Sequence, residues 1–144
     1  MVLPPGYDQP LTYLPPNLER IHFGHDFDQK VDNLPDSIIN LSFGHNFNQS
    51  VDSLPKSLQS LEFRESDYYP HQYNMGGSFN QPIDNLPDSL RFLHLNSSFE
   101  QSLDSLPNDL FYFTHRGKKF KVENGKYYLW KVIERWEVSP IESY

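Results

Sequence analysis

The chain has 144 residues, a formal net charge of −7, a pI near 5.2 and no cysteine. The acidic balance disfavours nucleic acid and anionic lipid as partners, and the missing thiols exclude disulfides and thiolate metal sites. No apolar run approaches the length of a membrane span, and no secretory leader is recognisable, so we expect a soluble, intracellular protein.

Charge is unevenly distributed along the chain. Residues 1–115 carry 15 acidic side chains against 5 Lys and Arg, whereas residues 116–144 carry 7 Lys and Arg against 4 acidic ones. The basic C-terminal part is interpreted either as a patch for an acidic partner or as a solvated end that complements the acidic coils.

An internal repeat of about 20 residues organises the chain. Five segments superpose without gaps, and one insertion at 67–78 interrupts them. The predicted repeats are 7–26, 27–46, 47–66, 79–98 and 99–118. Residues 1–6 resemble the Leu-Pro half of a further coil, and 119–144 lack the repeat and form a C-terminal cap. Because the first full coil has little above it, we expect exposed apolar surface and a possible homo-oligomer through this edge.

Each repeat shares a set of apolar columns. An aromatic ring opens the unit, an aliphatic follows four positions later, Leu-Pro comes next, and an L-x-x-L-x-F/L pattern closes it. Alternation in the closing stretch predicts a strand with Leu61 and Phe63 in the core and Glu62 facing out. Because proline precludes a long helix on the return path, we predict a mainly β solenoid with a parallel sheet on its concave face.

Polar columns recur as well. Ser37, Ser57 and Ser89 are suited to closing the turn that follows each Leu-Pro through a side-chain to backbone hydrogen bond. The glutamines at the third position of each unit are predicted to hydrogen-bond neighbouring coils. A single carboxylate per coil without a Gly-rich loop argues against a calcium-binding repeat.

The unit resembles the FNIP repeat family, most closely in Phe79-Asn80-Gln81-Pro82-Ile83 followed by Leu86-Pro87. The resemblance implies a curved, leucine-rich-repeat-like solenoid of the kind found in social amoebae and in giant viruses that infect amoebae. Because no leader is recognisable and cysteine is absent, we expect a cytoplasmic location, which is that of the host if the protein is viral. In larger family members such repeats can follow an F-box, which would make them the substrate-recognition part of a ubiquitin-ligase adaptor.

The C-terminal part reads as a hairpin, because Asn124-Gly125 separates two β-rich segments. Phe120, Val122, Tyr128, Trp130 and Val132 are expected to cover the last coil. A helix from about residue 128 to 136 is a competing interpretation.

No catalytic motif, cofactor-binding loop or metal-ligand cluster is recognisable, and the histidines are too far apart to share a metal. We therefore expect a non-enzymatic module without cofactors that binds a protein partner. We expect most of the binding free energy to come from Phe92, Tyr112, Arg64 and Arg116, since aromatic residues and Arg contribute most at interfaces. The outward face is expected to be lined by Arg20, His22, Asn40, Ser42, Ser60, Glu62, Arg64, Phe92, His94, Asn96, Tyr112, Thr114 and Arg116. The insertion adds Tyr68, Tyr69, His71 and Tyr73 as candidate contacts.

Overall fold

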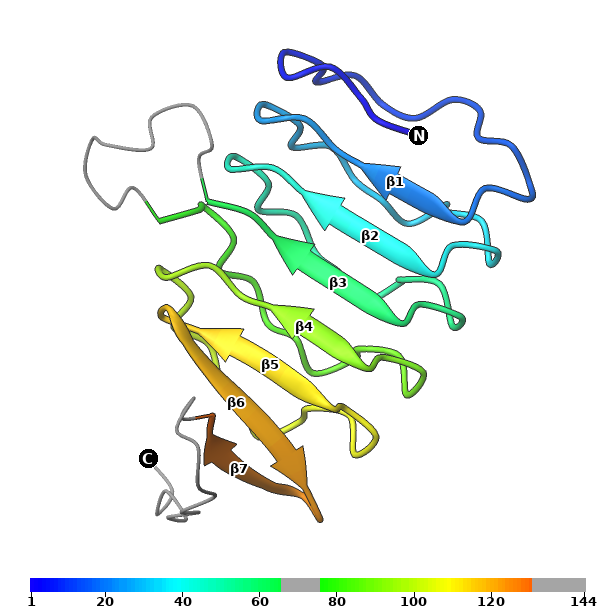
Figure 1. Ribbon diagram of the computed structural model, residues 1–144. Helices are drawn as coiled ribbons and strands as arrows, with labels where there is room; N and C mark the ends of the chain where they lie inside the picture. The colour runs from blue at the N-terminus through cyan, green and yellow to red at the C-terminus, as the bar shows by residue number, and fades with distance from the viewer. Residues whose placement is uncertain (66–75, 131–144) are drawn as a thin grey trace.

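A computed structural model describes residues 1–65 and 76–130. The chain winds as a β-solenoid in which each coil contributes one strand to a single sheet (Figure 1). The strands are β1 Arg20–His22, β2 Asn40–Phe43, β3 Ser60–Phe63, β4 Phe92–His94, β5 Tyr112–His115, β6 Lys118–Glu123 and β7 Lys126–Leu129. Their order in space is their order in the chain, and the described residues contain no helix.

The first five strands pair in parallel and without slippage. Leu41 of β2 lies opposite Leu61 of β3, which lies opposite Leu93 of β4 and then Phe113 of β5. This register repeats the sequence alignment of the units, so the predicted parallel β-solenoid is confirmed.

Stacked phenylalanines form the centre of the core. One column, from the opening aromatic position, contains Phe27, Phe47, Phe79 and Phe99, and all four are almost fully buried. A second column from the strand ends interleaves with it: the Phe63 and Phe79 ring centroids lie 3.6 Å apart. Because every coil supplies the same ring at the same depth, each neighbour extends the stack without a change of backbone path.

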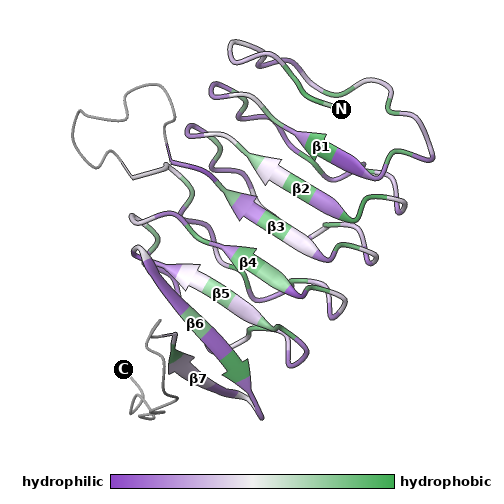
Figure 2. Cartoon of the chain, in the orientation of Figure 1, coloured by the Kyte–Doolittle hydropathy of each residue, from purple (hydrophilic) through white to green (hydrophobic). Residues whose placement is uncertain are grey.

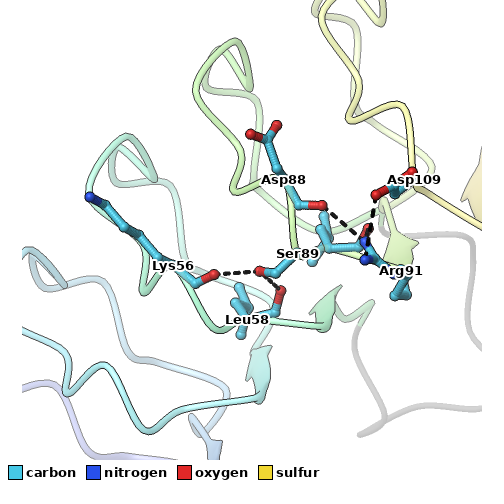
Figure 3. A network of polar contacts seen from close by, with 7 residues as sticks. Lys56, Leu58, Asp88, Ser89, Arg91 and Asp109 are labelled. Atoms are coloured by element: carbon cyan, nitrogen blue, oxygen red, sulfur yellow. Dashed lines mark hydrogen bonds and ion pairs between the residues drawn. The ribbon is translucent and has the colours of Figure 1, made fainter.

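The return turns use backbone hydrogen bonds that the sequence alone does not specify. In each one, the amide of the residue three positions after the proline donates to the proline carbonyl, as Leu58 does to Pro55 at 3.1 Å. The described serine contacts do not close these turns, contrary to the prediction. Ser37 donates to the carbonyl of Leu18 in the preceding coil, and Ser89 Oγ lies 2.6 Å from the carbonyl oxygens of both Lys56 and Leu58 (Figure 3). The serine column therefore connects coils.

A polar ladder runs along the second position of the repeat, where Asp8, Asp28, Asn48, Asn80 and Glu100 stand. A side-chain oxygen of each of the first four accepts the backbone amide of the next member, as from Asn80 N to Asn48 Oδ1 at 2.9 Å. The following glutamine donates to the same oxygen in three places, for example Gln49 Nε2 to Asp28 at 3.0 Å. The prediction that glutamines connect coils is confirmed, and the acceptor at the second position is the part that sequence reasoning missed.

The C-terminal end reverses direction twice. β6 pairs antiparallel with β5 across the turn Arg116-Gly117, and β7 pairs antiparallel with β6 across Asn124-Gly125. All four turn residues have positive φ, between 50° and 70°, as two-residue hairpins of this hand require. The predicted hairpin at Asn124-Gly125 is confirmed. The first reversal was not predicted, and it ends the fifth repeat at its strand.

This hairpin covers the last coil of the core. Phe120 stacks on Phe113 at 4.9 Å, and Tyr127 meets the same ring edge-on at 5.2 Å while its hydroxyl donates to the Leu103 carbonyl. Burial and the nearby Asp104 carboxylate raise the pKa of Tyr127. Tyr127, and not Tyr128 as expected, packs on the core with Phe120 and Val122. Val132 and most of the competing helix lie outside the described residues, while Tyr128 and Leu129 belong to β7.

The N-terminal segment takes the strand position of a coil. Val2 bridges to His22 in parallel, and the Leu3 amide donates to the His22 carbonyl at 2.8 Å. A Cβ on Gly24 would collide with the carbonyl of Pro4, so the two coils approach closely one repeat apart. The expected likeness of residues 1–6 to the Leu-Pro half is therefore wrong, since they stand in register with the strand end at residues 21–26.

Candidate binding face

The outward side chains of the strands form two rows across the sheet, which we call the sheet face. The first row contains Arg20, Asn40, Ser60, Phe92, Tyr112, Lys121 and Tyr128. The second row contains His22, Ser42, Glu62, His94, Thr114, Lys119 and Trp130. Inward neighbours such as Leu61 and Leu93 are buried, so each strand anchors its face residues on the core.

The half of the sheet face over β1 to β3 is polar. Arg20 and His22 are exposed, and the Ser42 hydroxyl donates to the Glu62 carboxylate at 3.2 Å. Figure 2 shows the change along the sheet, with hydrophilic residues on β1 and β3 and a largely hydrophobic β4. The character of the face thus changes between β3 and β4.

The half over β4 to β7 carries the aromatic–lysine cluster, which consists of Phe92, Phe111, Tyr112, Lys119 and Trp130. The Phe92 ring lies 5.7 Å from Phe111 and 5.0 Å from Tyr112. The Lys119 ammonium stands 3.7 Å from the centre of the Tyr112 ring and 4.7 Å from that of Trp130. Two rings on one ammonium fix the geometry by cation–π attraction.

Much of this cluster remains accessible to solvent. Phe111 is 59% exposed and Trp130 is 38% exposed, and these are two of the five large hydrophobic side chains that stand out to solvent in the described residues. A shallow hollow beside Phe111 is lined by Arg91, Asp109, Leu110 and Val122 among others, and Arg91 forms an ion pair with Asp109 at 3.6 Å (Figure 3). The rings of the cluster are therefore accessible, and the depression adjoins Phe111 just before β5.

The predicted face residues differ in their position relative to the sheet face and in their exposure to solvent. Arg20, His22, Ser60, Glu62, Phe92, His94, Tyr112 and Thr114 lie on the sheet face with solvent access, and His94 Nδ1 lies 2.7 Å from Thr114 Oγ1. Ser42 lies on the face but is only 5% exposed. Arg64 follows β3, and Tyr68, Tyr69, His71 and Tyr73 lie outside the described residues.

Two predicted face residues do not lie there. Asn96 is 1% exposed, and its side-chain amide donates to the Phe79 carbonyl while its Oδ1 accepts the Ser98 amide. It stabilises the turn after β4 and is not accessible to a partner. Arg116 stands in the hairpin turn, where it approaches Glu100 at 3.9 Å. The cation expected from Arg116 is supplied at the cluster by Lys119.

Sequence reasoning missed Lys119 and Lys121 as face residues because it assigned the segment to a fifth repeat and a cap. The signal was the Arg116-Gly117 dipeptide before a stretch of alternating character, since Gly tolerates the left-handed backbone of a tight hairpin. Once the strand turns back there, Lys119 and Lys121 pair with Thr114 and Tyr112 and share their side of the sheet.

The described part of the chain contains no group of three or more His, Asp or Glu side chains placed to hold a metal ion. Within the same residues, no helix is long and apolar enough to cross a membrane.

The fold and its face define a class of protein, a β-solenoid repeat protein. Its coils share one backbone path, and their two rows of outward side chains differ from coil to coil. The family described as FNIP Repeat matches residues 30–66 and 79–112, and the chain belongs to this family. These stretches span the strands from β2 to the start of β5. The chain matches none of the curated proteins.

Proposed function

We propose that this FNIP repeat protein is a non-enzymatic protein-interaction module whose partner docks on the sheet face over β4 to β7. The observation that carries the proposal is the ammonium of Lys119 held between the exposed ring of Trp130 and that of Tyr112. Aromatic side chains are enriched at protein interfaces because they offer large contact area at low conformational cost.

The chemistry of the cluster favours an extended acidic segment that carries aromatic or aliphatic side chains. Lys119 brings positive charge to the face of a chain whose net charge is −7, so an acidic partner is attracted to this part of the surface more than to the rest. Lys121 is ion-paired with Glu123 at 3.4 Å. The Phe92 ring, which contacts Phe111 and Tyr112, supplies apolar surface next to the ring over which the Lys119 ammonium stands.

A binding role fits the face better than catalysis. Two hydroxyls on the face lie beside a group that could act as a base: Ser42, which donates to Glu62 and is nearly inaccessible, and Thr114, whose Oγ1 lies 2.7 Å from His94 Nδ1. A catalytic nucleophile is reached by substrate and is activated by a base that a third group orients. Ser42 is not reached, and within the described residues the side-chain partner of His94 is Thr114 itself.

The insertion at 67–78 and an F-box supplied elsewhere belong to the same proposal as extensions of it. The aromatic insertion would add contacts beyond the sheet face, and the solenoid would serve as the substrate-recognition part of a ubiquitin-ligase adaptor. In either case the sheet face over β4 to β7 would remain the rigid surface that recognises the partner.

The proposal is tested by selecting from a displayed library of random peptides against the immobilised full chain. We expect acidic sequences with aromatic residues to be enriched, and their capture to fall at least tenfold with the double variant Phe92→Ala/Tyr112→Ala, as for the loss of interface hot spots. The matched control is Arg20→Ala/Asn40→Ala, in the same row of the sheet at its other end, which should bind as the parent does. Equal loss in both variants, or enrichment of basic peptides, would refute the proposed face.

A further inference from the structure

The second row of the sheet face carries a negative charge over β3 and a positive charge over β6. The strand register places Glu62 opposite His94, His94 opposite Thr114, and Thr114 opposite Lys119, so these four residues lie in one line across the sheet. Within residues 1–65 and 76–130, neither Glu62 nor Lys119 forms an ion pair. The two charges are therefore open to a partner.

The contacts of these two side chains leave both charges in place. Glu62 accepts the Ser42 hydroxyl at 3.2 Å, and a carboxylate has further lone pairs for a cation. The Lys119 ammonium is held by the rings of Tyr112 and Trp130, which attract it without neutralising its charge. Because both side chains are partly accessible, each can contact a group of the opposite sign.

The row between the two charges is neutral. His94 Nδ1 and Thr114 Oγ1 lie 2.7 Å apart, so these polar atoms already have a partner in each other. Beside them in the first row stand the rings of Phe92 and Tyr112, 5.0 Å apart and partly exposed. This middle section favours an aromatic or aliphatic side chain over a charged one.

The spacing of the charges matches an extended peptide that crosses the strands. Neighbouring strands lie about 4.8 Å apart, so the steps from β3 through β4 and β5 to β6 separate Glu62 from Lys119 by about 14 Å. An extended chain covers that distance in about four residues, and every second side chain faces the sheet. A peptide lying along the strands would reach only one of the two charges.

We propose that the partner is an extended segment that crosses from β3 to β6 with a basic residue at Glu62 and an acidic residue at Lys119. The residue midway between them places an aromatic or aliphatic side chain over Phe92 and Tyr112. This inference rests on the proposed function and specifies the partner of the same face. A segment with an acidic residue at Glu62 is repelled, so the row selects by charge order as well as by net charge.

The test is selection from a displayed library of random peptides on the full chain and on two charge-reversal variants. The parent should enrich peptides in which a basic and an acidic residue stand about four positions apart, in either order, around a central apolar residue. Glu62→Lys should replace the selected basic residue by an acidic one, and Lys119→Glu should replace the acidic residue by a basic one. The matched control is Arg20→Glu, which reverses a charge over β1 and should select the same peptides as the parent.

A milder variant separates lost charge recognition from lost folding. Glu62→Gln keeps an acceptor for the Ser42 hydroxyl, and far-ultraviolet circular dichroism should match that of the parent. Fluorescence anisotropy with a labelled peptide selected on the parent should show a dissociation constant raised about two- to fivefold, as for loss of an exposed ion pair. When the basic residue of that peptide is replaced by alanine, the parent and Glu62→Gln should bind it equally.

The outcomes distinguish this inference from the proposed function. Enrichment of acidic, aromatic peptides without a basic residue at a fixed spacing would overturn the inference and leave the proposed function standing. Charge-reversal variants that select the same peptides as the parent would do the same. A parent that captures no acidic, aromatic peptide, or capture that Phe92→Ala/Tyr112→Ala leaves unchanged, would overturn both.

Discussion

The two ends of the solenoid differ in how they cover the apolar surface of the terminal coil. At the C-terminal end the chain reverses at Arg116-Gly117, and the antiparallel hairpin lays Phe120 and Tyr127 over the core. At the N-terminal end, Met1 to Leu3 continue the parallel pattern for one short segment, and the apolar columns stay partly open. The repeat alone cannot terminate the solenoid, because each terminal coil exposes an apolar face that a further coil would cover.

The comparison also explains where the sheet face acquires its character. Parallel coils place one variable residue of each unit in each row, and in β1 to β3 these residues are polar or charged. The hairpin adds two antiparallel strands whose outward residues come from outside the repeat. They place Lys119, Lys121, Tyr128 and Trp130 on the same face of the sheet as Phe92 and Tyr112. The strands that close the core are thus the ones that build the aromatic–lysine cluster.

The largest expected contrast concerns the opening aromatic column. Phe47→Ala should lower the free energy of unfolding by about 3–5 kcal/mol, since it removes a buried ring that packs 3.7 Å from Phe43. Tyr7→Ala, in the same column of the open coil, should cost about 1–2 kcal/mol, because that ring is half-buried. Urea denaturation followed by circular dichroism measures both, and equal losses would mean that the N-terminal coil is as well covered as the interior.

Two substitutions in the Arg116-Gly117 turn should have opposite effects on the free energy of unfolding. Gly117 has φ near 69°, so Gly117→Ala should destabilise the chain by about 1–2 kcal/mol through backbone strain alone, because no atom lies within 4 Å of the added Cβ. Arg116→Asn, at φ near 50°, should stabilise it by about 0.5 kcal/mol, since Asn tolerates this region better than Arg. Thermal unfolding would separate the two, and shifts of the same sign would contradict the assigned turn.

The polar ladder predicts a smaller loss. Asn80→Ala removes the oxygen that accepts the Glu100 amide at 2.8 Å, which should cost about 1 kcal/mol. Asn80→Asp keeps an acceptor and serves as the control, with most of the stability retained. If the two variants unfold at the same urea concentration, the side-chain oxygen does not stabilise the next coil.

The smallest expected effect is on how the free energy of unfolding depends on pH. Burial and then the neighbouring His25, whose ring stacks 5.1 Å away, lower the pKa of His45, while Glu65 opposes them. A folded-state pKa below that of the unfolded chain means that the unfolded state binds the proton more tightly. Stability should therefore fall as pH drops through the ordinary histidine value near 6.5 and level off below the lowered pKa of the folded state.

The His45→Gln variant isolates this contribution. Its unfolding midpoint should vary less with pH than that of the parent between about pH 7 and pH 5, where histidine titrates. Parallel curves for the two proteins would remove His45 as the source.

Much of the fold could be predicted from the sequence because the repeat units can be aligned with one another within the chain. Five phenylalanine or tyrosine positions, 20 residues apart except across the insertion at 67–78, determine register and core depth. The parallel pairing of Leu41, Leu61, Leu93 and Phe113 follows from them. The ends were harder, because a single terminal segment has no second example within the chain. Residues 1–6 were consequently placed in the wrong half of a coil.

The candidate site was predicted in part for the same reason. Phe92 and Tyr112 stand in the repeat and were assigned to the outward face correctly, whereas Lys119 and Trp130 depend on a reversal signalled by one Arg-Gly dipeptide. Asn96 was misplaced because alternation was continued two residues beyond the end of β4 at His94, where the chain turns and the Asn96 side-chain amide donates to the Phe79 carbonyl. Strand alternation predicts orientation only while the strand lasts.

The central claim, that a partner binds over β4 to β7, is tested most directly by nuclear magnetic resonance mapping of the labelled full chain with a selected acidic peptide. The account predicts shifts concentrated at Phe92, Phe111, Tyr112, Lys119 and Trp130, with β1 and β2 unchanged. Shifts concentrated on the polar ladder or at Arg20, His22 and Asn40 would contradict it.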